Sequence, residues 1–154
     1  MPRLIPITDE NINVVLNFIN AKVEKLGTVL PVDKKTFYKY FPEGKSFAVL
    51  GKTGIESVLT ISKGRGKGIP TIRTRIYASN INAMRNALEH VKKAALTMEA
   101  LYLRTSVFSY SEENKWLKKL GFVQGALIPA AACLKGKLYD IIYYYYDLRS
   151  YYDF

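Results

Sequence analysis

The fold of this chain is decided by the stretch at residues 101–147. It holds LYLRTSV at 101–107, SEENKWLKKLGF at 111–122, an apolar run, and KGKLYDIIYYYYDL at 135–148. The first segment predicts a strand, and the second predicts a short amphipathic helix closed by a glycine. The apolar run and the last segment predict two strands that turn at Gly136.

The short helix carries start and stop signals of its own. Ser111 is placed to cap its N-terminus, and Gly121 fits the left-handed position past its end. Phe122 is then able to pack back on the last turn. One face of the helix carries Trp116, Leu117 and Leu120.

This order of elements resembles the C-terminal half of the GNAT superfamily, the acyl-CoA-dependent N-acyltransferases. The family pattern there is an apolar strand, a helix ending in K-L-G-F, and a hairpin with G-x-x-x-D near its turn. The matching residues are Lys119-Leu120-Gly121-Phe122 and Gly136-Lys137-Leu138-Tyr139-Asp140. The family comparison implies a structural role for Asp140.

The rest of the chain extends the resemblance. Strands are predicted at 3–8, 46–50, 55–62 and 71–78. Helices are predicted from just after Thr8 or Asp9 to about Gly27, at 33–41 and at 80–98, the last with Met98 in its buried stripe. Thr8 or Asp9 is expected to cap the first helix, and Ser79 or Asn80 the third. With the C-terminal half this gives β-α-α-β-β-β-α-β-α-β-β, the GNAT order. We therefore expect one α+β domain over residues 1–154, with a mixed sheet whose central strands, 71–78 and 101–107, are parallel and splayed. Another α+β sandwich with this order remains the alternative.

The resemblance also implies a cosubstrate, acetyl-CoA. In the family, pantetheine pairs with the backbone of the fourth strand, here at Tyr77 and Ala78. The pyrophosphate rests on the following helix N-terminus, where N–H groups and the helix dipole favour an anion. The corresponding residues here are Asn80, Asn82, Ala83, Met84 and Arg85.

This sequence departs from the family in that loop. Members usually carry glycines there, whereas residues 77–85 read YASNINAMR. An ordinary capped helix that does not bind CoA is thus the second interpretation. The motif Arg65-Gly66-Lys67-Gly68-Ile69 imitates the glycine pattern, but a strand follows it, so a basic hairpin tip is the better interpretation.

The catalytic residues are less well marked. The family's tyrosine acid falls at Leu117, and the asparagine often found after the fifth strand falls near Tyr110. Tyr110 is therefore the candidate acid and Glu56 the candidate base, with a surface carboxylate as the alternative for Glu56. Without its usual acid, such an enzyme would turn over slowly.

Composition limits the partners. The formal net charge of +10 favours anionic ligands, including CoA, nucleic acid and acidic proteins. The tyrosine run at 143–146 places alternate rings outward, where they would line a substrate cleft, form a homodimer interface or stack bases.

The remaining composition gives compartment and cofactor expectations. The single cysteine, Cys133, fits a reducing cytoplasm and is expected to be buried and inert. His90 has no partner at ligand spacing, so no metal site is expected. No segment predicts a membrane span, and one glutamine among many Ile, Lys and Tyr is typical of heat-adapted proteins.

The leading hypothesis is acetyl transfer from acetyl-CoA to a primary amine. The alternatives are a non-catalytic GNAT-fold binding protein and a basic nucleic-acid-binding protein.

Overall fold

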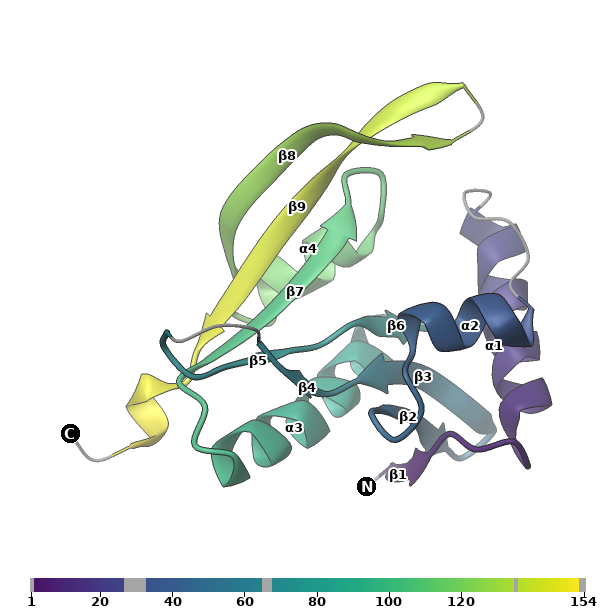
Figure 1. Cartoon of the computed structure of the whole chain (residues 1–154), viewed down its shortest axis with the longest axis horizontal. Coiled ribbons are helices and arrows are strands. Elements are labelled where there is room, and N and C mark those ends of the chain that lie inside the picture. The colour runs from purple at the N-terminus through teal and green to yellow at the C-terminus, as the bar shows by residue number, and fades with distance from the viewer. Residues whose placement is uncertain (1, 27–32, 65–67, 135, 153–154) are drawn as a thin grey trace. The chain divides into compact units, whose positions relative to one another are not determined.

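The computed structural model describes residues 2–26, 33–64, 68–134 and 136–152. They form two compact units, one from residues 1–60 and 76–88 and the other from residues 61–75 and 89–154. Both units mix helices with β-strands, so the α+β class is confirmed (Figure 1).

The first unit is built on a four-stranded antiparallel sheet in the order β1-β2-β3-β6. Its strands are β1 (Arg3–Pro6), β2 (Ser46–Gly51), β3 (Gly54–Thr60) and β6 (Ile76–Ala78). Its helices are α1 (Ile12–Leu26), α2 (Lys34–Tyr40) and the first half of α3 (Ile81–Thr97). The apolar cluster of the unit joins Ile7, Ile12, Val15, Ile19, Phe37, Phe41, Ala48 and Val58.

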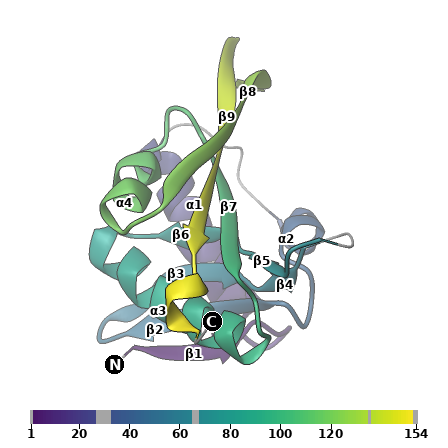
Figure 2. The same cartoon turned by 90° about the vertical axis from the view of Figure 1, so that its left-hand side faces the viewer.

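The second unit is built on a five-stranded mixed sheet in the order β4-β5-β7-β9-β8. Its strands are β4 (Ser62–Lys63), β5 (Thr71–Arg73), β7 (Tyr102–Phe108), β8 (Val123–Leu134) and β9 (Lys137–Asp147). The second half of α3, α4 (Glu113–Lys119) and the 3-10 turn η1 (Arg149–Tyr151) complete it. Strands β8 and β9 form a long hairpin, and α4 lies to one side of it (Figure 2).

The predicted order of elements is confirmed, with one correction in the middle. The strand expected at 71–78 is two strands that belong to different sheets. β5 pairs in parallel with β7, which confirms the predicted pairing for Thr71, Ile72 and Arg73. Thr74 still donates its N–H to the Arg104 carbonyl at 2.9 Å, after which the chain leaves this sheet and β6 pairs with β3.

The end of α4 follows the sequence signals. Gly121 has a φ of +98°, and the Phe122 N–H donates to the Leu117 carbonyl at 3.0 Å. Leu117 and Phe122 are both buried. At the start of the helix, the Ser111 hydroxyl accepts the Glu113 N–H at 3.2 Å. The glycine stop at 121 and the packing of Phe122 are thereby confirmed.

Three local predictions were wrong: the cap of the first helix at Thr8 or Asp9, the burial of Met98 and the burial of Cys133. The first helix begins at Ile12 because Asn11 fixes the preceding turn, accepting the Thr8 N–H and donating to the Pro6 carbonyl, both at 2.9 Å. Met98 is exposed because α3 ends at Thr97. Cys133 is exposed because it lies on β8, the edge strand of its sheet, near the end of the hairpin.

Candidate functional site

The N-terminus of α3 is capped by a single asparagine. The Asn80 side-chain oxygen accepts the Ala83 N–H at 2.9 Å, and its carbonyl accepts the Met84 N–H at 3.0 Å. Of the two predicted caps, Asn80 is confirmed. The N–H groups of Ile81 and Asn82 meet no acceptor among the residues that the structure describes. Such groups at a helix start are suited to hold an anion.

The charge at this end of the helix is positive. The first turn of α3 contains no acidic side chain, so the helix dipole is not neutralised there. Arg85 is exposed, and its guanidinium donates to the Asn82 side-chain oxygen at 2.8 Å. This contact holds the guanidinium at the same turn that presents the two N–H groups.

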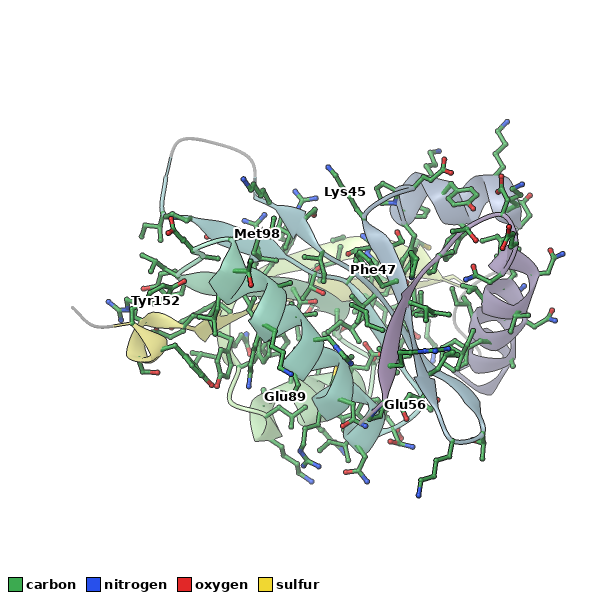
Figure 3. The ribbon with its side chains drawn as sticks, turned by 90° about the horizontal axis from the view of Figure 1, so that it is seen from below. Lys45, Phe47, Glu56, Glu89, Met98 and Tyr152 are labelled. Atoms are coloured by element: carbon green, nitrogen blue, oxygen red, sulfur yellow. The ribbon has the colours of Figure 1, made fainter. Side chains whose placement is uncertain are left out.

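Glu56 ties β3 to this turn. Its carbonyl accepts both the N–H and the hydroxyl of Ser79 at 3.0 Å, and its carboxylate accepts the Asn86 side-chain amide at 3.1 Å. The carboxylate also lies against Gly51, where an added Cβ would approach it to 2.7 Å. Glu56, labelled in Figure 3, is half-buried and is held by two residues of the α3 segment.

The pairing register of β6 gives its two candidate residues, Tyr77 and Ala78, opposite backbone directions. Because Ser79 donates to Glu56, the hydrogen-bonded pairs of this antiparallel ladder are Ser79 with Glu56 and Tyr77 with Val58. The backbone of Tyr77 therefore points toward β3, and that of Ala78 points to the opposite edge of β6. The expected backbone contacts of Tyr77 and Ala78 with pantetheine stay a prediction.

Some of the N–H groups at the start of α3 already have an acceptor within the protein. The N–H groups of Ala83 and Met84 already donate to Asn80, and both residues are buried. Asn80 contributes as the cap, while Asn82 and Arg85 are exposed. Ile81, Asn82 and Arg85 are therefore the residues of this turn with groups suited to a phosphate, and the phosphate contacts themselves stay a prediction.

Tyr110, the candidate acid, belongs to the second unit. Its ring stacks on Phe108 with centroids 5.5 Å apart and meets Tyr139 edge-on at 4.6 Å. The tyrosine is half-buried, so these rings fix its position. Glu56, the candidate base, belongs to the first unit.

The neighbouring positions have structural contacts. Leu117, where the family carries its acid, is buried with 1% exposure and fills the core beneath α4. The Asp140 carboxylate accepts the N–H of Ala130, whose φ is +49°, at 3.0 Å. Asp140 therefore holds a β8 bulge in place, and this contact is structural.

Two asparagine contacts were missed by the sequence prediction. Asn86 donates to Glu56, and Asn114 accepts the hydroxyl of buried Tyr144 at 2.7 Å. Nothing in the local pattern distinguishes these amides from solvated helix residues. Their partners lie 30 positions away in the chain, so only the tertiary fold reveals them.

Two other expectations concern charge and metals. The predicted basic tip at Arg65 and Lys67 lies outside the described residues. Within the described ranges, no three His, Cys, Asp or Glu side chains gather closely enough to hold a metal ion. No helix in this part of the chain has both the length and the apolar character needed to cross a bilayer.

Comparison with known proteins gives no family model and no curated relative in sequence. Solved structures do match. An N-acetyltransferase from Staphylococcus aureus Mu50 gives a TM-score of 0.75 at 15% identity, covering 97% of this chain and 99% of that one. A ribosomal-protein-alanine N-acetyltransferase from Brucella melitensis gives 0.72 at 12% identity, covering 95% and 99%. The protein yncA from Salmonella typhimurium, solved with its cofactor acetyl-CoA, gives 0.70 at 13% identity, covering 96% and 94%.

Proposed function

We propose that this chain, which has the fold of the GNAT N-acetyltransferases, transfers an acetyl group from acetyl-CoA to a primary amine. The fold likeness covers nearly the whole chain and nearly the whole of each matched structure. The observation that carries the proposal is the start of α3. There a GNAT fold presents two N–H groups and an arginine, although the usual glycines are missing.

The residues at this turn fit the CoA pyrophosphate. Ile81 and Asn82 would donate their N–H groups to phosphate oxygens, and the Arg85 guanidinium would add a positive charge beside them. Asn80 would hold the turn in shape through its cap on Ala83. Ala78, whose backbone points away from β3, would contact pantetheine. Tyr77 would support this strand through its ring, which packs on Phe41 at 5.5 Å.

Two residues are proposed for proton transfer. Bound acetyl-CoA supplies a reactive thioester, so the protein must hold the amine in place and handle two protons. We assign Glu56 as the base that takes a proton from the amine and Tyr110 as the acid that gives one to the departing thiolate. The Asn86 amide donates to the Glu56 carboxylate at 3.1 Å and thus fixes the direction of the proposed base.

The acceptor is assigned only as an amine. One of the matched proteins is a ribosomal-protein-alanine N-acetyltransferase, which is consistent with a protein amine as acceptor. The single cysteine of this chain is consistent with a reducing cytoplasm. A cytoplasmic location therefore belongs to the proposal, and the acceptor stays at the level of an amine.

A second candidate function is a GNAT-fold protein that binds CoA or a partner without catalysis. Buried Leu117 in place of the family's acid favours it. Assays with a set of amines separate the two candidates. Acetylation of any amine supports the enzyme, and acetyl-CoA binding without acetylation supports the binding protein. A ligand at 100 times its Kd stabilises the folded state by about 2.7 kcal/mol. A thermal shift therefore detects acetyl-CoA binding whether or not the protein is an enzyme.

A further inference from the structure

The five-stranded sheet has one buried face and one face that carries arginines and tyrosines. Along β7, Leu103 and Thr105 are buried, whereas Arg104 between them is exposed. β5 alternates in the same way, with Ile72 buried and Arg73 exposed. In β9, Tyr144 is buried and Tyr145 is 38% exposed. The strand period of two therefore places one set of side chains outward.

The pairing register brings this outward set together. Arg73 on β5 pairs with Arg104 on β7, and Arg104 pairs with Tyr145 on β9. Paired residues of adjacent strands point to the same face, as do residues two positions along a strand. Tyr102 and Tyr143 thus join the set. We call Arg73, Tyr102, Arg104, Tyr143 and Tyr145 the arginine–tyrosine face. All five residues belong to the second unit.

Among the described residues, no acidic side chain neutralises the two arginines. Like charges side by side on neighbouring strands repel each other and destabilise a sheet. Neither Arg73 nor Arg104 makes an ion pair within the residues that the structure describes. Asp147 is the acidic residue of this face in β9, and Arg149 binds its carboxylate with distances of 2.8 to 3.1 Å. A concentrated positive charge therefore remains at the Arg73–Arg104 pair.

The tyrosines add flat rings next to this charge. The Tyr102 and Tyr145 rings meet edge-on with centroids 6.2 Å apart, and the Arg149 guanidinium lies 5.6 Å from the Tyr102 centroid. An exposed sheet face that combines arginines with aromatic rings suits a ligand that carries both phosphates and flat rings. Arginine binds phosphate oxygens in a forked geometry, and bases stack on aromatic rings.

We propose that the arginine–tyrosine face binds single-stranded nucleic acid, with phosphates at Arg73 and Arg104 and bases on the tyrosines. A single strand exposes the faces of its bases, as stacking on Tyr145 and Tyr143 requires. The net charge of +10 adds the general attraction that nucleic acids exert on basic proteins. This binding goes beyond the proposed acetyl transfer and does not depend on it.

Fluorescence anisotropy of the full chain with labelled oligo(U) and oligo(dT) of about 16 nucleotides tests the proposal, over salt from about 50 to 200 mM. Each lost phosphate contact reduces the slope of log affinity against log salt by about 0.7. Arg73→Ala with Arg104→Ala should therefore reduce it by about 1.4. Tyr145→Ala should weaken binding about tenfold with the slope unchanged, and Tyr145→Phe should retain the affinity.

The matched control is Lys115→Ala with Lys118→Ala, which removes two exposed charges from α4. This control should leave the slope unchanged. Melting temperatures check that every variant is folded. An equal loss of slope in both double variants would mean diffuse charge attraction and would overturn the proposal. Full retention of affinity by Tyr145→Ala would also overturn it. The proposal would also be overturned if no oligonucleotide bound, or if poly-glutamate bound through Arg73 and Arg104 and the oligonucleotides did not.

Discussion

The Asn80 side chain caps α3 by accepting the Ala83 N–H at 2.9 Å, in the turn where Arg85 is exposed. This one contact shapes the turn that we assign to the CoA pyrophosphate. Two substitutions separate its structural role from its electrostatic role, because aspartate caps a helix as well as asparagine does but carries a negative charge.

Asn80→Ala should lower the free energy of unfolding by about 1 kcal/mol, because the Ala83 N–H loses its acceptor. Asn80→Asp should leave stability unchanged or slightly raised and weaken acetyl-CoA binding about tenfold, since its carboxylate repels the phosphates. Urea unfolding and calorimetry measure the two quantities. Equal acetyl-CoA affinity in Asn80→Asp and wild type would place the phosphates elsewhere.

Glu56→Gln tests the proposed base. Glutamine keeps an oxygen that is able to accept the Asn86 amide, and the backbone contacts with Ser79 do not involve the side chain in question. The melting temperature should therefore stay within about a degree or two while kcat falls about 10²-fold or more. An unchanged kcat would show that Glu56 only ties β3 to α3.

Tyr110→Phe tests the proposed acid. The ring contacts with Phe108 and Tyr139 remain possible for phenylalanine, so the local packing should persist. We expect kcat to fall about 10²-fold while acetyl-CoA affinity stays nearly constant, because the hydroxyl acts only in the chemical step. Acetylation at the wild-type rate would remove Tyr110 from the mechanism.

The pH dependence of stability should include Asp33, the cap of α2. The Thr36 N–H donates to the Asp33 carboxylate at 2.8 Å and holds its pKa below the usual range. A lowered folded-state pKa contributes stability above the unfolded pKa, about 3.9, and this contribution is lost as pH falls through the folded value. The loss therefore occurs below about pH 4.

Asp33→Asn provides the comparison, because asparagine keeps the cap without titrating. Urea midpoints measured from neutral pH down to about pH 3 should fall less steeply in Asp33→Asn than in wild type. Parallel curves for the two proteins would contradict the assignment.

Gly121→Ala and Gly136→Ala form a second matched pair. Both glycines have positive φ, +98° and +77°, so each alanine should cost about 1–2 kcal/mol of backbone strain. A Cβ at Gly121 would also lie 3.0 Å from the Tyr146 ring, whereas nothing stands within 4 Å at Gly136. Urea unfolding should therefore show the larger loss for Gly121→Ala, and equal losses would mean that Tyr146 moves aside freely.

Local signals in the sequence were sufficient to predict most elements. The α4 stop at Gly121, the Asn80 cap and the β8–β9 turn at Gly136 all depend on contacts between residues close in the chain. For such features, residue type and spacing contain nearly all of the physical information.

What the sequence could not show depends on distant partners. Residues 71–78 alternate without a break, so nothing marks Thr74 and Arg75 as the point where one strand leaves one sheet for another. Cys133 looks like a core residue, yet no strand pairs with β8 on its outer edge in the described sheet. The Glu56–Asn86 and Asn114–Tyr144 contacts likewise exist only once the fold is formed.

The central claim is that the start of α3 binds acetyl-CoA, and one calorimetric titration tests it most directly. Wild type, Arg85→Glu and Lys35→Glu are titrated with acetyl-CoA under the same conditions. Both substitutions reverse one exposed positive charge in the first unit, but only Arg85 stands at the α3 turn. We predict saturable binding of one acetyl-CoA by wild type and Lys35→Glu, and binding at least about tenfold weaker by Arg85→Glu. No binding by wild type, or equal affinity in all three proteins, would contradict the account.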